Sequence, residues 1–407
     1  MTTATQKIPS GYKQTDIGVI PADWDVKECK ELGSFYKGRG ISSKDLVSAG
    51  VPCIMYGDIY VKFDTKFSNP DFRITKETAA KSTLARTGDL LFTASGETVE
   101  EIGKCVAYEG KEDIYIGGDI IGMTPNKDTD SLFLAYAQNS QFLLSQKANL
   151  GQGYTVVHIY TEHIKSLKIA LPPSKKEQTA IASVLSGTDG LIAKLEALIE
   201  KKKYIKQGAM QELLTGKRRL AGFIEKWEIK RLGDIFRVTR GQVLAMTKTT
   251  KYKLGDYQYP VYSSQTKDNG LAGYYKEYLF ENCVTWTTDG ANAGEVKYRP
   301  GKFYCTNVCG VLESNQGYAN LCVAAIFNGV SRKYVSYIGN PKLMNNVVAD
   351  IKISIPSSIK EQMAISEFIS DMDAELEKLE SQLAKYQNLK QGMMQVLLTG
   401  KIRLLSK

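Results

Sequence analysis

Two stretches of the chain carry apolar residues at alternating spacings of four and three, which is typical of a helix with a heptad seam. The first lies within residues 171–216 and the second within residues 355–407. The seam falters at Lys202 and Lys206 and at their counterparts Tyr386 and Lys390. An apolar stripe of this length is unstable in water, so the two helices are expected to pack on each other. The predicted helix–helix seam consists of Ile181, Leu185, Ile192, Leu195, Ile199, Ile365, Ile369, Met372, Leu376, Leu379 and Leu383.

The ends of both helices are marked by the same signals. Pro172 and Pro356 stop the preceding strands, and a serine follows each of them at the N-cap position. A glutamate three residues later, Glu177 or Glu361, completes a capping-box pattern. Gly216 and Gly400, each followed by basic residues, mark the C-terminal ends. A helix over residues 175–213 would be about 58 Å long at about 1.5 Å per residue.

The two helical segments are copies of each other. Residues 171–220 and 355–404 align without a gap, with about half of their positions identical, and the string LLTGK recurs intact. Upstream, Trp24–Lys27 resembles Trp227–Lys230. Between these anchors the halves diverge, which indicates a duplicated frame with inserts for different ligands; the alternative is neutral drift of loops.

Connectivity predicts how the helices run. Residues 217–354 leave the end of the first helix and return to the start of the second. A compact domain of that size has a radius of gyration of about 14 Å, too small to carry the chain back along a rod of about 58 Å. Antiparallel helices are therefore expected, with the two globules at opposite poles.

The inserts are rich in short Tyr, Val, Ile and Phe runs broken by turn residues, such as Val51–Tyr56 and Cys283–Thr287. Few helices are expected there, among them Ser131–Gln138 and Ala319–Phe327. The predicted fold class is α+β, with two tandem pseudo-symmetric halves, each a mixed α/β domain plus a long helix, and the helices packed as an antiparallel coiled coil. The predicted domains are residues 1–170, 171–216, 217–354 and 355–407.

Composition narrows the setting. The formal net charge of +9 over 407 residues favours an acidic partner such as nucleic acid. Tyrosines beside basic residues, as in Tyr298-Arg299, suit contacts to phosphates and bases, but they are equally ordinary in strands and decide nothing. The sequence contains no apolar run long enough to span a membrane, and its first residues lack the apolar core of a signal peptide. A cytoplasmic protein without membrane contact is expected, and the odd number of cysteines, seven, suits a reducing compartment.

Catalytic and metal-binding patterns are weak. Cys305 and Cys309 could form half of a metal site, but only two histidines, His158 and His163, could complete it. The sequence has neither a GxxxxGK[ST] phosphate loop nor the Asn-Pro-Pro-Tyr motif of adenine methyltransferases. Asp71 and Glu109-Gly110-Lys111 could be forced into a nuclease set, although a turn and a hairpin explain them better. No metal site, no bound cofactor and no catalytic residue are predicted.

The chain resembles the specificity (S) subunit of type I restriction–modification systems. The match rests on Ile17–Glu28, the P-x-x-x-x-EQ helix starts, both LLTGK-x-R-L ends, and the phrases Tyr259–Tyr275 and Thr287–Gly294. The resemblance implies that each globule is a target-recognition domain reading one half of a bipartite, asymmetric site in double-stranded DNA. It implies that the helices set half-site spacing and dock two methyltransferase (M) subunits, which bind S-adenosylmethionine, and that restriction/translocase (R) subunits using ATP and Mg²⁺ join the complex.

Basic and polar loops are the expected DNA contacts, because phosphate contacts position a reader and base-edge contacts specify the sequence. An alternative for each residue is an ordinary solvated loop side chain, and the alternative function is a coiled-coil adaptor whose globules bind a non-DNA partner. Lys201–Lys203 is interpreted as a solvated helix face or a contact to central phosphates. The predicted DNA-binding residues are Lys37, Arg39, Ser95, Gln152, Tyr154, Arg240, Gln242, Ser263, Ser264, Gln265, Lys267 and Thr288.

Overall fold

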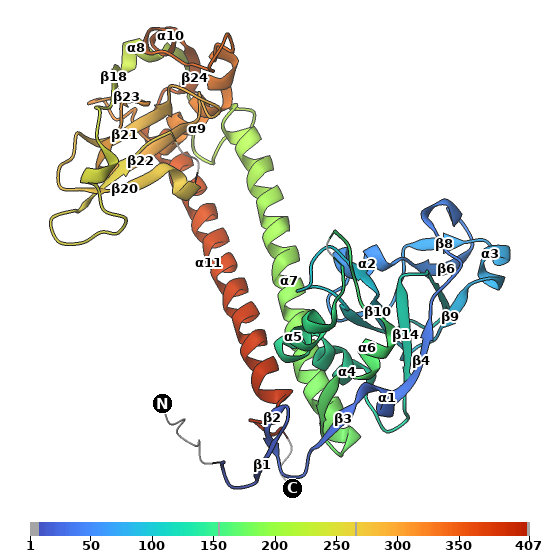
Figure 1. The fold of residues 1–407 in the computed structure, drawn as a ribbon. Coiled ribbons are helices and arrows are strands. Elements are labelled where there is room, and N and C mark those ends of the chain that lie inside the picture. Colours follow the sequence, from blue (N-terminus) through green and yellow to red (C-terminus); the bar gives the residue numbers. More distant parts are fainter. Residues whose placement is uncertain (1–7, 154, 265–266, 405–407) are drawn as a thin grey trace. The chain divides into compact units, whose positions relative to one another are not determined.

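The computed structural model describes residues 8–153, 155–264 and 267–404. Contacts divide the chain into two compact units (Figure 1), the first Met1–Leu195 with Gln382–Lys407 and the second Glu196–Ser381. Each unit holds one globule and parts of both long helices.

The long helices are α7 (Lys175–Leu213) and α11 (Ile359–Leu397), both of 39 residues. Within the second unit Arg219, just past α7, pairs with Glu361 at the start of α11. Within the first unit Arg403, past α11, pairs with Glu177 at the start of α7. The end of each helix therefore meets the start of the other, and the predicted antiparallel packing is confirmed.

The predicted seam positions lie on the inner side of both helices. Six of them are buried: Ile181, Leu185, Ile199, Ile365, Ile369 and Leu376. The other five are half-buried: Ile192, Leu195, Met372, Leu379 and Leu383. The interruption at Lys206 and Lys390 has a cause, because each lysine pairs with an aspartate of the opposite helix, Asp373 and Asp189 respectively.

The first globule contains two sheets. The larger has the order β4 (Gly33–Lys37), β14 (Ile120–Pro125), β10 (Leu90–Thr93), β12 (Cys105–Tyr108) and β7 (Lys66–Phe67). The smaller has the order β5 (Leu46–Val47), β8 (Phe72–Ile74), β6 (Val51–Ile54), β13 (Ile114–Ile116) and β9 (Thr83–Ala85). Two-stranded pairs join β1 (Tyr12–Thr15) to β2 (Gly18–Pro21), β3 (Asp25–Glu28) to β16 (Lys168–Leu171), and β11 (Ser95–Gly96) to β15 (Val157–His158).

Helices surround these sheets. They are α1 (Cys29–Leu32), α2 (Tyr56–Val61), α3 (Lys76–Ala80), α4 (Ser131–Gln138), α5 (Gln141–Leu150) and α6 (Thr161–Lys165). The predicted helix Ser131–Gln138 is confirmed as α4, whose N-cap Asp130 accepts from the backbone N–H of Phe133. The predicted strand Val51–Tyr56 ends at Ile54 because α2 begins at Tyr56.

The second globule is built around one sheet, in the order β18 (Arg237–Arg240), β23 (Cys309–Glu313), β21 (Phe280–Thr287), β22 (Val296–Cys305), β19 (Tyr259–Tyr262) and β20 (Leu271–Tyr275). At its base β17 (Trp227–Arg231) pairs with β24 (Lys352–Pro356). The helices are α8 (Leu232–Ile235), α9 (Leu321–Ser331) and α10 (Asn345–Asp350). The fold class predicted from the sequence is confirmed.

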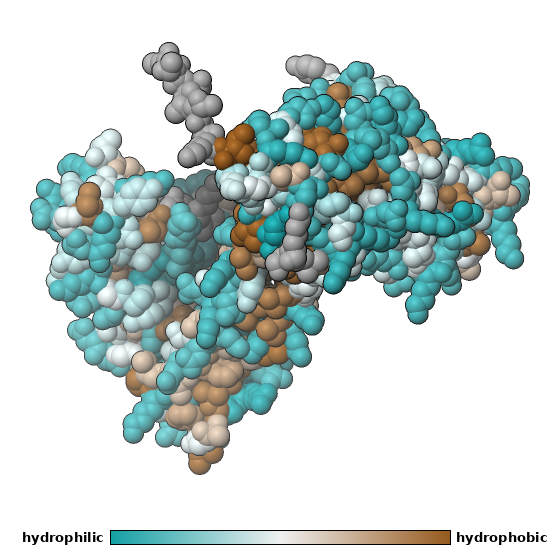
Figure 2. Space-filling view, turned by 90° about the horizontal axis from the view of Figure 1, so that it is seen from below, coloured by the Kyte–Doolittle hydropathy of each residue, from teal (hydrophilic) through white to brown (hydrophobic). Residues whose placement is uncertain are grey.

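Each unit has its own apolar core. In the first, Phe92, Phe133 and Tyr136 are fully buried together with Ile181 and Leu185 of α7. In the second, Trp286 and Phe327 are buried together with residues of α11. Hydrophilic side chains cover most of the face drawn in Figure 2, with smaller hydrophobic patches between them. Among the described residues no helix is both long and apolar enough to cross a membrane.

Candidate nucleic-acid interface

The two globules share a four-strand frame whose residues match position by position. The order β4-β14-β10-β12 in the first is the order β18-β23-β21-β22 in the second. Lys37 pairs with Ile121 in the first frame, and Arg240 pairs with Gly310 in the second. Thr93 faces Ile120 as Thr287 faces Cys309. Lys37 and Arg240, both predicted DNA contacts, therefore occupy equivalent positions at the end of the first frame strand.

The loops beyond these strands are joined by the same backbone hydrogen bonds in both globules. Gly38 donates to the carbonyl of Ile120 at 2.9 Å, and Gly241 donates to that of Cys309 at 3.0 Å. The N–H groups of Ala94 and Thr288, which follow the central strand, donate to Asp119 and Val308 at 2.8 and 3.0 Å. The loop after the first frame strand and the loop after the central strand therefore meet at one end of each sheet.

A glycine is required where these loops touch. A Cβ on Gly38 would lie 1.9 Å from the carbonyl oxygen of Gly117, and one on Gly241 would lie 2.3 Å from that of Cys305. Such distances are far inside van der Waals contact, so a larger residue would push the loops apart. The basic residue followed by glycine in both globules, Lys37-Gly38 and Arg240-Gly241, marks this close approach.

In the second globule a polar cluster forms at this sheet end. The Arg240 guanidinium donates to Thr288 Oγ1 and Asp289 Oδ2, both at 2.9 Å, and to the carbonyl oxygen of Asn307 at 2.5 Å. Arg240 remains half-exposed, whereas Thr288 is completely buried. Charge-assisted bonds of this kind hold an arginine in one orientation. Arg240 is therefore fixed with part of its surface facing solvent, and Thr288 serves to position it.

Ser263 and Ser264 lie in the loop after β19, close to the same cluster. Ser263 Oγ accepts from Thr306 Oγ1 at 3.0 Å, and the carbonyl of Ser264 accepts from the side chain of Asn292 at 3.4 Å. Both serines are half-buried. Gln242 is exposed, and its N–H donates to the carbonyl of Cys305. Gln265 and the side chain of Lys267 lie outside what the structure describes.

A buried arginine supports the loop that carries these serines. Arg299 stacks on the ring of Tyr262, with its Cζ 3.8 Å from the centroid, and donates to the carbonyl of Asn269 at 2.7 Å. It is 5% exposed, and burial lowers its pKa. The Tyr298-Arg299 pair is of the kind that is also ordinary in strands, and here Arg299 is buried and does not offer its guanidinium to a phosphate at the surface.

In the first globule the predicted residues are spread more widely. Lys37, Arg39 and Gln152 are exposed. Ser95 is 6% exposed, and its Oγ contacts His158 Nδ1 at 3.0 Å and Asp119 at 3.3 Å. The contact between Ser95 and His158 therefore joins the segment that follows β10 to strand β15.

Gln152 lies next to the same strand. Its backbone exchanges hydrogen bonds of 2.9 and 2.7 Å with His158, so His158 lies between this exposed glutamine and Ser95. Tyr154 is outside the described residues. In the aligned frames Ser95 is the counterpart of Asp289, and Ala94 that of Thr288. The sequence analysis missed Asp289, His158 and Asp119 because only the register brings them to these loops.

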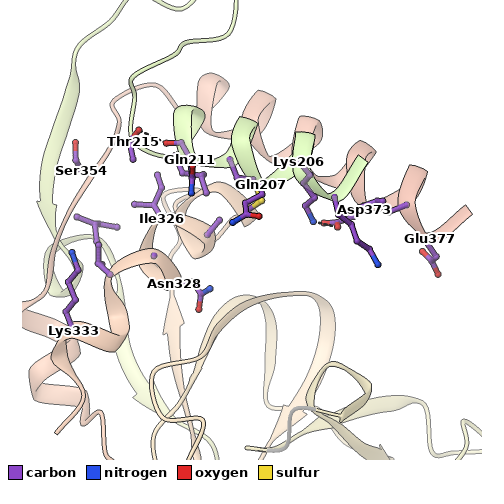
Figure 3. A pocket seen from close by; sticks show the side chains of 18 of the residues that line it. Lys206, Gln207, Gln211, Thr215, Ile326, Asn328, Lys333, Ser354, Asp373 and Glu377 are labelled. Carbon is purple, nitrogen blue, oxygen red and sulfur yellow. Dashed lines mark hydrogen bonds and ion pairs between the residues drawn. The ribbon is translucent and has the colours of Figure 1, made fainter. Parts of the chain in front are cut away.

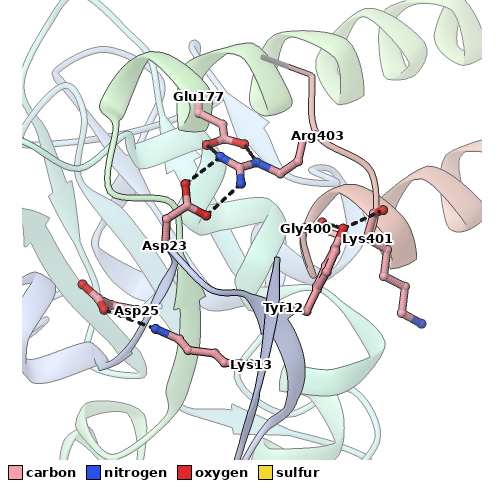
Figure 4. A network of polar contacts seen from close by, with 8 residues as sticks. All are labelled: Tyr12, Lys13, Asp23, Asp25, Glu177, Gly400, Lys401 and Arg403. Atoms are coloured by element: carbon pink, nitrogen blue, oxygen red, sulfur yellow. Dashed lines mark hydrogen bonds and ion pairs between the residues drawn. The ribbon is translucent and has the colours of Figure 1, made fainter. Parts of the chain in front are cut away.

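The repeated motifs meet elsewhere, at the joint between each globule and the helix pair. In the first joint (Figure 4) Arg403 lies between Glu177 and Asp23, bonding Glu177 through two nitrogens and Asp23 at 2.9 and 3.2 Å. Its Cζ is 5.7 Å from the ring centroid of buried Trp24. The two carboxylates raise the pKa of Arg403. The hydroxyl of Tyr12 donates to the carbonyl of Gly400 at 3.0 Å.

The second joint repeats this chemistry. Arg219 donates to both oxygens of Glu361 at 2.5 Å and lies 6.0 Å from the ring of Trp227. Glu177 and Glu361, which the sequence places in capping boxes, thus accept from arginines of the other helix end. Behind them Gln178 and Gln362 donate to the carbonyls of Pro172 and Pro356 at 2.9 and 2.8 Å. The shared sequence therefore builds the joints, and the divergent sequence builds the loops.

The cysteines and the candidate metal ligands also have defined positions in the structure. All seven cysteines are buried with free thiols. Among the described residues no cluster of three or more His, Cys, Asp or Glu side chains could hold a metal ion. Burial raises the pKa of Cys309 to about 11, so this thiol is neutral at physiological pH.

Relatives share this arrangement. Over 96% of both chains, the protein is 26% identical to a chain described as the type I restriction enzyme MjaX specificity subunit of Methanocaldococcus jannaschii. It is 30% identical over 229 residues to a type I specificity subunit of Mycoplasma pneumoniae, covering 92% of that chain and 53% of this one.

Solved structures agree in fold. A type I restriction-modification S subunit from M. genitalium has a TM-score of 0.62 at 17% identity, covering 92% of this chain and 96% of that one. The HsdS subunit from Thermoanaerobacter tengcongensis has a TM-score of 0.52 at 14% identity, covering 94% and 98%. The family model described as the type I restriction modification DNA specificity domain matches residues 21–203 and 224–385. The chain therefore belongs to the type I restriction-modification specificity subunits and carries two target-recognition domains.

Proposed function

We propose that each globule reads one half of a bipartite, asymmetric DNA site through the loops at the end of its four-strand frame. The observation that carries this proposal is the matched position of Lys37 and Arg240 on two otherwise unlike loop sets. A cation at the same place in both readers suits a phosphate contact, which fixes orientation without specifying sequence. The unlike neighbours, such as Gln152 in the first globule and Ser263 in the second, suit base-edge contacts.

The helix pair acts as a spacer in this proposal. Two continuous helices of 39 residues, closed at both ends by the same arginine–glutamate joint, support a fixed separation between the readers. Half-site spacing then follows from protein geometry, as it does for other modular DNA readers. The Lys201–Lys203 run belongs to this spacer: Lys202 and Lys203 pair with Glu375 and Glu380 of the other helix, which supports a mainly structural role.

The chain is proposed to be non-catalytic and to work within a larger complex. Two methyltransferase subunits would dock on it and bind S-adenosylmethionine, and restriction/translocase subunits would bring ATP and Mg²⁺. Membership of the specificity family supports assembly into a restriction–modification complex. Buried neutral thiols and the lack of a metal-ligand cluster among the described residues agree with a recognition role for this chain.

The test is methylation-site mapping of DNA modified by this chain together with its methyltransferase partner. We expect one bipartite target with two unlike halves. Exchanging residues 232–350 for those of another specificity subunit should change one half-site and preserve the other, because the joints at Trp227 and Glu361 stay intact. A contiguous target, or methylation without sequence preference, would overturn the proposal and favour the adaptor alternative.

A further inference from the structure

Each unit contains an apolar groove at the C-terminal end of a long helix, and the two grooves are lined by equivalent residues. The groove of the second unit, which we call groove 2 (Figure 3), lies between the end of α7, residues 373–380 of α11, helix α9 and strand β24. The groove of the first unit, groove 1, lies between the end of α11, the α4–α5 turn and strand β16. The matched lining positions are Gln207/Gln391, Met210/Met394, Gln211/Gln395, Leu214/Leu398, Thr215/Thr399, Ile353/Ile169 and Ser354/Ala170.

The two grooves differ in what fills them. Groove 1 has a volume of about 280 Å³, and groove 2 about 1180 Å³. In groove 1 the chain's own N-terminal hairpin, β1–β2, forms part of the wall and contributes Ile17, Val19 and Ile20 to the lining, whereas groove 2 lacks the hairpin and also extends along α11. Ile20 is 2% exposed and belongs to the same apolar cluster as Met394 and Leu398. The hairpin therefore acts as a built-in occupant of groove 1.

A charge accompanies these aliphatic residues. Asp16, immediately before Ile17, pairs with Lys168 on β16, beside groove 1. The hydrogen bond from Lys168 lowers the pKa of Asp16. Tyr12 anchors the other end of the hairpin to the carbonyls of Gly400 and Lys401, as Figure 4 shows. The occupant that this kind of groove accepts thus has a defined chemistry, an acidic residue followed by branched aliphatic side chains in a hairpin.

Groove 2 has the lining residues that correspond to those contacting the hairpin in groove 1, but it has no hairpin. The segment before Trp227 runs as turns and loop, and none of residues 217–226, all of them described, lines the groove. Ile224, in this segment, is 93% exposed. Lys352, the counterpart of Lys168, lines groove 2, and no carboxylate among the described residues lies within ion-pair distance of it. Groove 2 therefore has the apolar lining residues, such as Leu214 and Ile353, and the lysine, Lys352, that correspond to those of groove 1, but no hairpin of its own chain contacts them.

We propose that groove 2 binds, in trans, an acidic–aliphatic hairpin of the methyltransferase subunit that mimics Asp16–Ile20. The identity of the partner rests on the proposed function; the chemistry of the segment rests on the occupied groove 1. A second copy of this chain is a poorer occupant, because exchanging hairpins between copies would empty one groove for each groove filled. The proposal makes the two ends of this pseudo-symmetric subunit unequal: one groove is closed by the chain itself, and the other is closed by a partner.

The first experiment uses a fluorescent peptide of residues 11–22 as the probe and the full-length chain as the receptor, measured by fluorescence anisotropy. We expect saturable binding of one peptide per chain. Lys352→Glu should weaken binding at least about tenfold, which is about 1.4 kcal/mol. The Asp16→Lys peptide should bind the Lys352→Glu chain better than the unaltered chain. The matched control is Lys226→Glu, an exposed lysine of the same unit that does not line the groove, and it should bind like the unaltered chain.

Charge reversal guards against misfolding, because a chain that failed to fold would not regain affinity for a reversed peptide. A second variant, Ser354→Trp, fills the groove from an exposed position of β24 and should also block the peptide. Binding that is unsaturable, or that is unchanged by both Lys352→Glu and Ser354→Trp, would overturn the proposal for groove 2.

The second experiment identifies the source of the segment. The chain and its methyltransferase partner are purified together, and the number of methyltransferase subunits per chain is measured by mass photometry. Two are expected for the unaltered chain and for Lys226→Glu, and one for Ser354→Trp. If Ser354→Trp blocks the peptide and still loads two subunits, the methyltransferase is not the occupant. If loading depends on groove 2 but methylation shows no bipartite target, the DNA-reading proposal fails and the groove assignment stands.

Discussion

Replacing Arg219 with alanine is expected to destabilise the second unit by about 3–4 kcal/mol at pH 7. Glu361, its bidentate partner, has a side chain only 1% exposed and would be left buried without a cation. Leaving one member of a buried pair alone costs about 3–5 kcal/mol. Because Arg219 itself is partly exposed, we expect the penalty at the lower end of this range.

Urea unfolding at pH 7 measures this loss of unfolding free energy, and amide hydrogen exchange of α9 assigns the loss to the second unit. The matched control is Arg218→Ala. Arg218 is exposed and its contact with the exposed Glu212 is long, at 3.6 Å, so this variant should change stability by less than about 0.5 kcal/mol. A penalty for Arg219→Ala below about 1 kcal/mol would refute the argument.

Three further predictions concern charge and DNA. Burial raises the pKa of the Cys322 thiol from 9.0 to about 12. The stability that the neutral buried thiol contributes is therefore complete below pH 9 and is lost progressively as the pH rises above 9. The unfolding free energy, measured by urea titration, should fall by about 1.4 kcal/mol less between pH 8 and 10 in Cys322→Ala than in the unaltered chain. Reversing Lys206 or Asp373 alone should cost less than about 1 kcal/mol, and reversing both should restore the thermal midpoint, because both side chains of the pair still reach solvent. Arg240→Ala should weaken DNA binding about equally for all sequences and reduce the salt slope by about 1 in a salt-controlled assay, leaving the methylated target unchanged, whereas unchanged binding would remove Arg240 from the interface.

The long helices could be predicted from the sequence because they depend on local periodicity. The duplication could be predicted because residues 171–220 and 355–404 align without a gap. Spacings of four and three place Ile181 and Leu185 on one helix face whatever the rest of the chain does, and both are buried. The same local reasoning assigned Glu177 to a capping box. Its actual partner, Arg403, is 226 residues away, and no local pattern reveals such a pair. The only signal for the joint was that its members recur in both halves.

The candidate DNA loops were harder to predict, because burial at a strand end depends on register. Thr288 and Ser95 are polar and close to glycines, which is typical of exposed loops, yet both are buried against the opposing strand end. Asp289 was overlooked because its partner Arg240 lies 49 residues earlier in the chain. Lys37 and Arg240 are equivalent when the strands of the two globules are aligned. That strand alignment comes from the hydrogen-bond register, which the sequence does not reveal.

The joints explain how recognition can change without loss of folding. Each joint is made of residues outside the frame loops: a tryptophan before the globule, a glutamate after it, and an arginine beyond the end of the other helix. A new globule therefore needs only to begin after the tryptophan and end before the glutamate to fit the same helix pair. The joints are not identical, since Arg403 also binds Asp23 whereas Lys226 stands at the corresponding place before Trp227. Loss of Arg403 leaves two facing carboxylates, Glu177 and Asp23, so Arg403→Ala should be more damaging than Arg219→Ala.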